Sequence, residues 1–202
     1  MSNSNAKKTG SYVHFITVTG ILSAAAFVLQ LIEFPVPMFM PTFIKLDFSD
    51  LPALLGAFSA GPLSGVLIEL IKNLLHVTVS GSFGVGELSN FILGAIFTGI
   101  AGLMYKRKKS KMNALIASIT GAIVMGLISF PSNLFVVYPV YYNFMPKDVI
   151  VAAYQAILPS VDSIEKCLLL FNVPFTIIKG FLNVILCFLI YKPLSPILKG
   201  RH

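Results

Sequence analysis

Charged residues and tryptophan are scarce in this sequence. Of its 202 residues, 11% are charged and 56% are hydrophobic, and none is tryptophan. Soluble domains carry about 25% charged residues, and disordered chains are far less apolar, so both classes are excluded. A spanning helix needs roughly 20 apolar residues, which leaves room for about six or seven spans. We therefore expect an integral membrane protein with one domain.

Cysteines and catalytic motifs are also few. The chain has two cysteines, Cys167 and Cys187, both in apolar surroundings, and this pattern predicts neither a disulfide framework nor a metal site. The sequence contains no HExxH, no GxSxG, no phosphate-binding glycine loop and no paired carboxylates on one helical face. We therefore expect a protein that is not an enzyme and that holds no cofactor or metal.

Apolar runs divide the chain into six expected helices. The pair Gly61-Pro62 interrupts the long apolar region 48–79, and this dipeptide is a strong helix break. The pattern predicts an all-α integral membrane protein, a compact bundle of six transmembrane helices in a single domain 1–202. The expected segments are a cytoplasmic tail at 1–12 and helices at about 13–33, 48–60, 62–79, 87–105, 112–142 and 167–191.

Basic residues have a one-sided distribution. Ten of the fifteen lie in the two tails and in the loop after the fourth helix, and those segments contain no acidic residue. By the positive-inside rule, both termini are expected in the cytoplasm. The basic clusters are short and lack interleaved aromatic residues, so we expect them to contact membrane lipid and not nucleic acid.

A polar stripe runs along the last predicted helix. Asn172, Thr176, Lys179 and Asn183 fall within about 60° of one another at helical spacing. A lysine inside a membrane costs at least about 2.5 kcal/mol unless it faces a partner or a wet cavity. The stripe is therefore expected to face inward, as the wall of a binding site. The alternative is a buried polar contact that only holds helices together.

Further polar residues lie toward the outer ends of two other helices. Glu87 and Asn90 begin the fourth helix, and Asn133 follows Pro131 in the fifth. Ordinary helix packing or a proline kink would explain them equally well. The outer loop 33–47 is rich in proline and bulky apolar residues, and it is expected to fold over an outer cavity. Such a cavity suits a ligand with an apolar aromatic plane and a hydrogen-bonding rim.

The third predicted helix carries Glu69, Lys72 and His76 on one face. Glu69 and Lys72 can neutralise each other at i,i+3 spacing, which favours a structural ion pair. The alternative is a membrane enzyme that uses Glu69 and His76, but a second carboxylate for acid-base work is missing. On the first helix, small residues predict either an internal seam or a docking face for another membrane subunit: Gly20, Ser23, Ala24, Ala25 and Ala26.

Three segments resemble the riboflavin-specific S-components of energy-coupling-factor (ECF) transporters. They are IKLDFSDLPALLGAFSAGPLSGVLIELIKNLLH from Ile44, GELSNFILG from Gly86 and NVPFTIIKGFLN from Asn172, and the resemblance extends over about residues 13–192. It implies a protein of the bacterial plasma membrane that captures riboflavin at its outer face. Delivery would require a T-component and two ATPases. The alternatives are an S-component for a different vitamin and a stand-alone carrier.

The resemblance also implies roles for particular residues. Those expected to bind the polar parts of riboflavin are Lys179, Asn172, Thr176, Asn133, Asn90 and Glu87, and those expected to close over its ring are Thr42, Phe43, Leu46 and Phe83. The small residues from Gly20 to Ala26 would dock the T-component. The first helix departs from the usual alanine-x-x-x-alanine pair of the family, and the nearest matches are Gly20 with Ala24 or the run Ala24-Ala25-Ala26.

Overall fold

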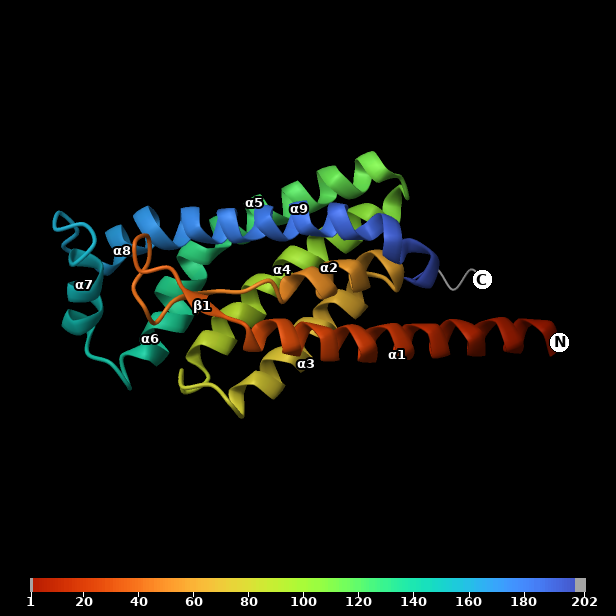
Figure 1. Ribbon diagram of the computed structural model, residues 1–202, viewed down its shortest axis with the longest axis horizontal. Coiled ribbons are helices and arrows are strands. Elements are labelled where there is room, and N and C mark those ends of the chain that lie inside the picture. Colours follow the sequence, from red (N-terminus) through yellow and green to blue (C-terminus); the bar gives the residue numbers. More distant parts are fainter. Residues whose placement is uncertain (1, 199–202) are drawn as a thin grey trace.

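The computed structural model describes the backbone of residues 2–198 and the side chains of residues 9–190. It is an elongated helical bundle (Figure 1). The first turns of α1 (Ser2–Leu31) and the last turns of α9 (Val173–Leu198) lie at one end of it, which we call the terminal end. The opposite end, which we call the loop end, holds α7 (Lys147–Gln155) and the segment that follows α1.

Four helical stretches are long and apolar enough to cross a membrane, as the hydropathy pattern predicts. They are α1, α4 (Val85–Arg107), α5 (Lys111–Ser132) with its continuation through η1 (Asn133–Val137) and α6 (Tyr138–Tyr141), and the stretch from α8 (Ile164–Cys167) through η2 (Leu168–Asn172) into α9. Two shorter helices, α2 (Asp50–Ser59) and α3 (Pro62–Val77), pack among them.

The break between α2 and α3 lies where the sequence predicts it. Gly61 adopts φ 108°, a conformation that favours glycine, and Pro62 begins α3, where a missing backbone N–H costs nothing. Because α2 is short, its polar ends could not both reach water across a membrane. It lies instead inside the bundle, with Asp50 through Ala57 buried.

The structure adds to the expected helices in two places. Residues 2–198 form seven continuous helical stretches, one more than the six expected spans, because the loop end contains α7. This helix is too short to span a membrane, and it buries Ile150 and Tyr154, whereas Val149 and Ala152 are exposed together with its polar residues. The predicted tail at 1–12 is helical from Ser2 onward, since backbone hydrogen bonding needs no apolar side chains and no proline interrupts this stretch.

Two π-helical turns interrupt long helices just before a proline. η1 ends two residues before Pro139, and η2 ends two residues before Pro174. Proline lacks the N–H that would bond the carbonyl four residues earlier, and its ring clashes with that carbonyl, so a wider turn relieves the conflict. Asn133 begins η1 and Asn172 ends η2, and such turns are frequent at functional sites.

Candidate functional site

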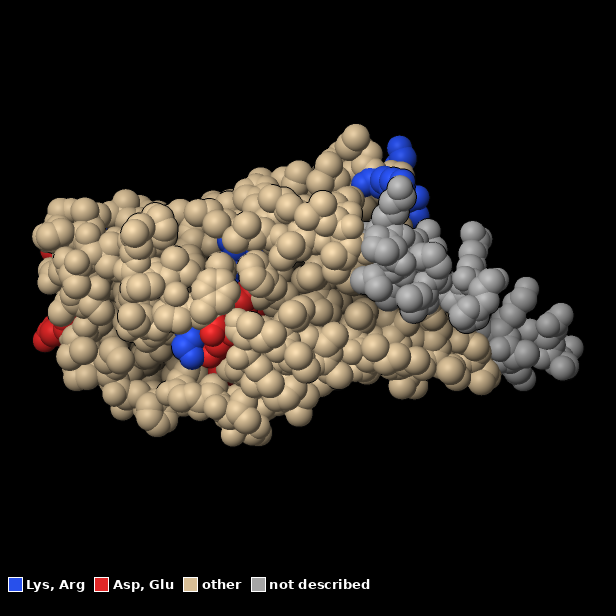
Figure 2. Space-filling model, viewed as in Figure 1, with Lys and Arg blue, Asp and Glu red and all other residues tan. Residues whose placement is uncertain are grey.

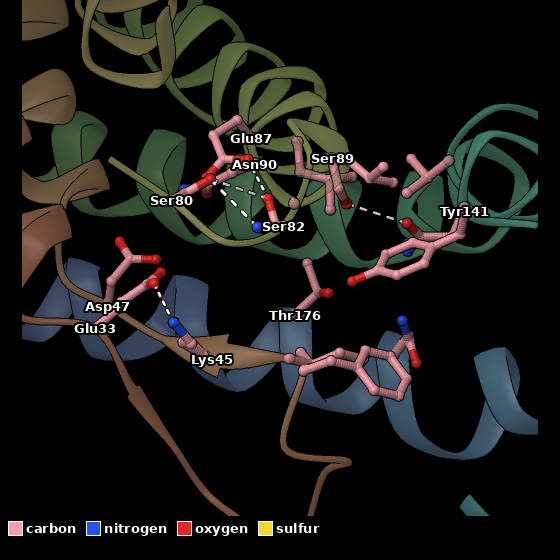
Figure 3. Close-up of a pocket in the computed structure, with 18 of the residues that line it drawn as sticks. Glu33, Lys45, Asp47, Ser80, Ser82, Glu87, Ser89, Asn90, Tyr141 and Thr176 are labelled. Atoms are coloured by element: carbon pink, nitrogen blue, oxygen red, sulfur yellow. Dashed lines mark hydrogen bonds and ion pairs between the residues drawn. The ribbon is translucent and has the colours of Figure 1, made fainter. Parts of the chain in front are cut away.

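A cavity of about 380 Å³ lies toward the loop end, between α4, α5, α9 and the segments that follow α1 and α3 (Figure 3). This volume is within the range of roughly 300–1,000 Å³ that is typical of small-molecule sites. The expected residues that line the cavity are Lys179, Asn172, Thr176, Asn133, Asn90, Glu87, Phe43 and Phe83. Five separate parts of the chain therefore meet at one site.

Thr42 and Leu46 do not line the cavity, so their expected positions are wrong. The segment after α1 forms a small antiparallel hairpin from β1 (Phe34–Pro35) and β2 (Lys45–Leu46). Successive strand residues point to opposite faces, and Lys45 faces the cavity, so Leu46 points away. Thr42 is exposed, whereas Phe43 turns inward, with its ring centroid 5.7 Å from that of Tyr141.

Lys179 is paired within the protein. Its Nζ lies 2.8 Å from Asp47 Oδ2 and 2.9 Å from Asn90 Oδ1, and the side chain is 12% exposed. The sequence analysis requires either a partner or a wet cavity for this ammonium group, and the structure provides both, because Lys179 also lines the cavity. Asp47 and Asp50 both lie in the KLDFSD segment, far from Lys179 in the sequence. They come close to Lys179 only because of the way the chain folds. Burial alone would raise the pKa of Asp47, but the ammonium groups of Lys179 and Lys72 hold it well below its usual range.

Asn172 is held in place by two tyrosines that sequence reasoning missed. Tyr154 of α7 donates its hydroxyl hydrogen to Asn172 Oδ1 at 2.5 Å, and the hydroxyl groups of Tyr154 and Tyr138 are 2.6 Å apart. Asn172 Nδ2 donates to the Tyr138 oxygen at 3.4 Å, so the three side chains form a closed ring. Burial raises the pKa of Tyr154 well above its usual value, which keeps its hydroxyl group protonated as a donor. The amide oxygen is thus engaged, and an amide N–H remains for a ligand acceptor.

Replacing Tyr154 with phenylalanine is expected to weaken ligand binding by about fivefold to tenfold, because the Asn172 amide loses its fixed orientation. Titration of ligand binding to the purified protein measures this change. The same substitution in an Asn172→Ala background should then have little further effect on affinity. Additive losses in this double-mutant cycle would contradict a role of Tyr154 through Asn172. Tyr142→Phe is the matched control, since Tyr142 lies outside both the ring and the cavity lining.

Glu87 anchors the loop between α3 and α4. Its Oε1 lies 2.7 Å from His76 Nδ1, and its Oε2 accepts a hydrogen bond from Ser82 Oγ (Figure 3). Phe83 follows with φ 55°, and its ring stacks on that of Phe144 at a centroid distance of 4.8 Å. Because the carboxylate is already bonded, Glu87 sets the position of the loop and of Phe83 at the cavity rim.

The remaining polar residues differ in how they are engaged. Asn133 Oδ1 accepts a hydrogen bond from Ser89 at 3.1 Å, and Thr176 points into the cavity (Figure 3). The contact between Glu69 and Lys72 that i,i+3 spacing predicts is present, with Oε2 and Nζ 2.7 Å apart, and Lys72 also contacts Asp50 at 2.6 Å. Asn183 is buried and donates to the Lys179 carbonyl at 3.0 Å, so it is a structural contact.

A family model described as "ECF transporter, substrate-specific component" matches residues 14–191. The chain belongs to this family. It is therefore a transporter subunit in a membrane and not an enzyme. The match covers all the cavity-lining residues named above, and it includes the two π-helical turns.

Relatives of this S-component agree with the family. It is 38% identical over 185 residues to "Riboflavin transporter RibU" of Staphylococcus aureus, an alignment that covers 91% of each chain. It is 30% identical to "Riboflavin transporter FmnP" of Bacillus subtilis, over 90% of this chain and 92% of the relative. A solved structure described as the S component of a bacterial ECF transporter superposes with a TM-score of 0.72 and 36% identity. That superposition covers 92% of this chain and 97% of the other.

Two of the small residues on the first helix of this S-component face inward. Ser23 is 3% exposed and donates to the Thr19 carbonyl, and Ala26 packs against Ala53 and Ile68. Their expected place on a docking face is therefore wrong, because this side of α1 is already covered by α2 and α3. Gly20, Ala24 and Ala25 are exposed.

Proposed function

We propose that this S-component captures riboflavin in the cavity at the loop end, for uptake driven by the ATPases of an ECF complex. The main support for this proposal is the lining of the cavity. One side of it presents Lys179, Asn172 and Thr176, and another presents the rings of Phe43 and Tyr141, which suits a flat aromatic ligand with a polar edge. The two relatives named as riboflavin transporters support this choice over another vitamin.

Binding of riboflavin to the purified protein tests the proposal directly. We expect protein from riboflavin-containing medium to be yellow, and ligand-free protein to quench the fluorescence of added riboflavin at a stoichiometry of one. A panel of other vitamins serves as the control. Colourless protein that quenches no flavin and binds another vitamin would contradict the proposal and favour a different substrate for the same fold.

We also propose that the loop end faces outward and that both termini are cytoplasmic, with α2 and α3 completing six membrane-embedded helices. The distribution of charge supports this orientation. Figure 2 shows one group of Lys and Arg near the terminal end, where the α4–α5 connection lies, and acidic side chains at the loop end. In the middle of the bundle, basic and acidic side chains lie next to each other. Cytoplasmic segments are enriched in Lys and Arg.

The exposed side of α1 is the proposed docking face for the T-component, and Gly20 and Ala24 are its central residues. They lie four residues apart, one turn above each other, and a Cβ added at Gly20 would meet no atom within 4 Å. Small side chains let two membrane helices approach closely. This support applies to Gly20, Ala24 and Ala25, since Ser23 and Ala26 are covered.

Replacing Ala24 with tryptophan is expected to reduce assembly with the T-component and ATPases at least about tenfold, because the bulky ring holds the helices apart. Co-purification of the complex measures assembly, and riboflavin binding by the isolated protein should be unchanged. Leu127→Trp on the exposed side of α5 is the control and should assemble normally. Normal assembly of the Ala24 variant would place the docking face elsewhere.

A further inference from the structure

Five ionisable side chains form a connected group at and behind the cavity wall, and we call them the charge cluster: the buried Asp47, Asp50, Glu69 and Lys72, and Lys179, which is 12% exposed. Lys72 Nζ lies 2.6 Å from Asp50 and 2.7 Å from Glu69, and Lys179 Nζ lies 2.8 Å from Asp47 and 3.6 Å from Asp50 Oδ2. The contacts therefore connect Glu69, which does not line the cavity, with Lys179, which does.

The charge cluster does not balance if every member is ionised. Three carboxylates and two ammonium groups leave one net negative charge among side chains that are at most 12% exposed. An uncompensated buried charge costs several kcal/mol. His76 and Glu87 are bonded to each other at 2.7 Å, and neither makes an ion-pair contact with the charge cluster among the described residues, so this pair does not offset the excess. One further positive charge is needed.

Glu69 is the member of the charge cluster with the poorest support for a carboxylate. Asp47 accepts hydrogen bonds from Lys179 and Ser49, and Asp50 accepts one from Lys72. Glu69 is fully buried, and among the described residues neither of its oxygens has a hydrogen-bond partner. Its Oε2 is near Lys72 Nζ, but the angles are not those of a hydrogen bond. The missing positive charge is therefore best placed on Glu69.

A metal cation does not fit beside Glu69. The backbone of α4 packs directly on the carboxyl group, because a Cβ added at Gly94 would lie 2.3 Å from Oε2. In the described part of the chain, no group of three or more His, Cys, Asp or Glu side chains could hold a metal ion. A proton needs no such space and removes the excess charge.

We propose that Glu69 is a proton-binding site, protonated in the folded protein and coupled through Lys72 and Asp50 to Lys179 at the cavity wall. The groups that face it are Lys72 on α3, Asp50 on α2 and Gly94 on α4, and Lys179 and Asp47 lie beyond Asp50. Loss of the proton strengthens the attraction between Lys72 and Glu69, whose Nζ and Oε2 already lie 2.7 Å apart, and so weakens the hold of Lys72 on Asp50. Asp50 then binds Lys179 more firmly. The ammonium group of Lys179 is then less available to a ligand in the cavity, so the affinity for that ligand falls at alkaline pH.

Infrared spectroscopy of the unliganded protein tests the proton itself. The spectrum at neutral pH should contain the carbonyl band of a protonated carboxylic acid, and Glu69→Gln should remove it without changing the melting temperature, because glutamine has nearly the shape of the protonated acid. Absence of the band would overturn the proposal. If the variant fails to fold, alkaline titration of the unmodified protein provides the second test, since the band must disappear as pH rises.

The pH dependence of riboflavin affinity tests the coupling, and this part rests on the proposed function. At each pH, the riboflavin affinity of the unmodified protein is divided by that of Glu69→Gln. We expect this ratio to fall at least about fivefold from neutral to alkaline pH. The ratio cancels titration of the ligand itself. A constant ratio would overturn the coupling. The infrared test needs no ligand, so failure of the proton site and failure of riboflavin binding are distinguishable.

Discussion

Replacing Lys179 with methionine is expected to weaken riboflavin binding by about 10- to 100-fold, because a hydrogen bond to a charged group contributes roughly 1.5–3 kcal/mol. It should also lower the free energy of unfolding by about 3–5 kcal/mol, since Asp47 is left buried without its cation. Fluorescence titration and denaturant unfolding of the ligand-free protein measure the two effects. Unchanged affinity would contradict a ligand-binding role for Lys179.

Two matched variants separate the ligand-binding role of Lys179 from its ion pair. Lys166 also forms an ion pair, 2.7 Å from Asp162, but both side chains are more than half exposed. Lys166→Met should therefore change stability by less than about 1 kcal/mol and leave affinity unchanged. The double variant Lys179→Met/Asp47→Asn removes both partners, so stability should largely recover while affinity stays low. Recovery of affinity would mean that Lys179 acts only by neutralising Asp47.

Replacing Lys72 with methionine is expected to cause the largest loss of stability, at least about 3–5 kcal/mol in the free energy of unfolding. Lys72 is fully buried, and its ammonium group contacts Asp50, Glu69 and the hydroxyl group of Ser49. No water can replace these contacts at a site with no exposed surface. Denaturant unfolding in detergent measures the loss, and a change below about 1 kcal/mol would contradict the assigned pairing.

A second substitution shows which charge Lys72 neutralises. Because Glu69 is inferred to be protonated, Asp50 is the carboxylate that loses its close cation in Lys72→Met and keeps only the 3.6 Å contact with Lys179. The double variant Lys72→Met/Asp50→Asn should therefore regain most of the lost stability, and adding Glu69→Gln should change little more. If recovery requires Glu69→Gln as well, then Glu69 is ionised, and the inference about its proton is wrong.

Local patterns of the sequence were sufficient for much of the fold. Apolar runs predicted the four long stretches, because the length of a spanning helix is a property of one segment. Gly61-Pro62 predicted the break between α2 and α3, since backbone restrictions act on neighbouring residues. The same reasoning failed for α7, because its nine residues are far too few for an apolar run of spanning length, and only such runs were used to place helices.

The candidate site was predicted in part for the same reason. Asn172, Thr176 and Lys179 share one face of a helix, so helical spacing alone predicted that they would lie on the same wall of a site, and all three line the cavity. Thr42 and Leu46 were misplaced because the direction of a loop side chain depends on strand pairing, here Pro35 with Lys45. The inward position of Ser23 and Ala26 depends on which neighbours α1 meets.

The sequence by itself determined the membrane class, the positions of most helices and the polar stripe of the last helix, since each depends on residues within a few turns of one another. Only the tertiary structure decided the partners of that stripe. Asp47 reaches Lys179 across 132 positions of the chain, and Tyr154 reaches Asn172 from a separate helix. Such pairs form because a buried polar group without a partner raises the free energy of the folded state. That penalty arises only when the helices have packed.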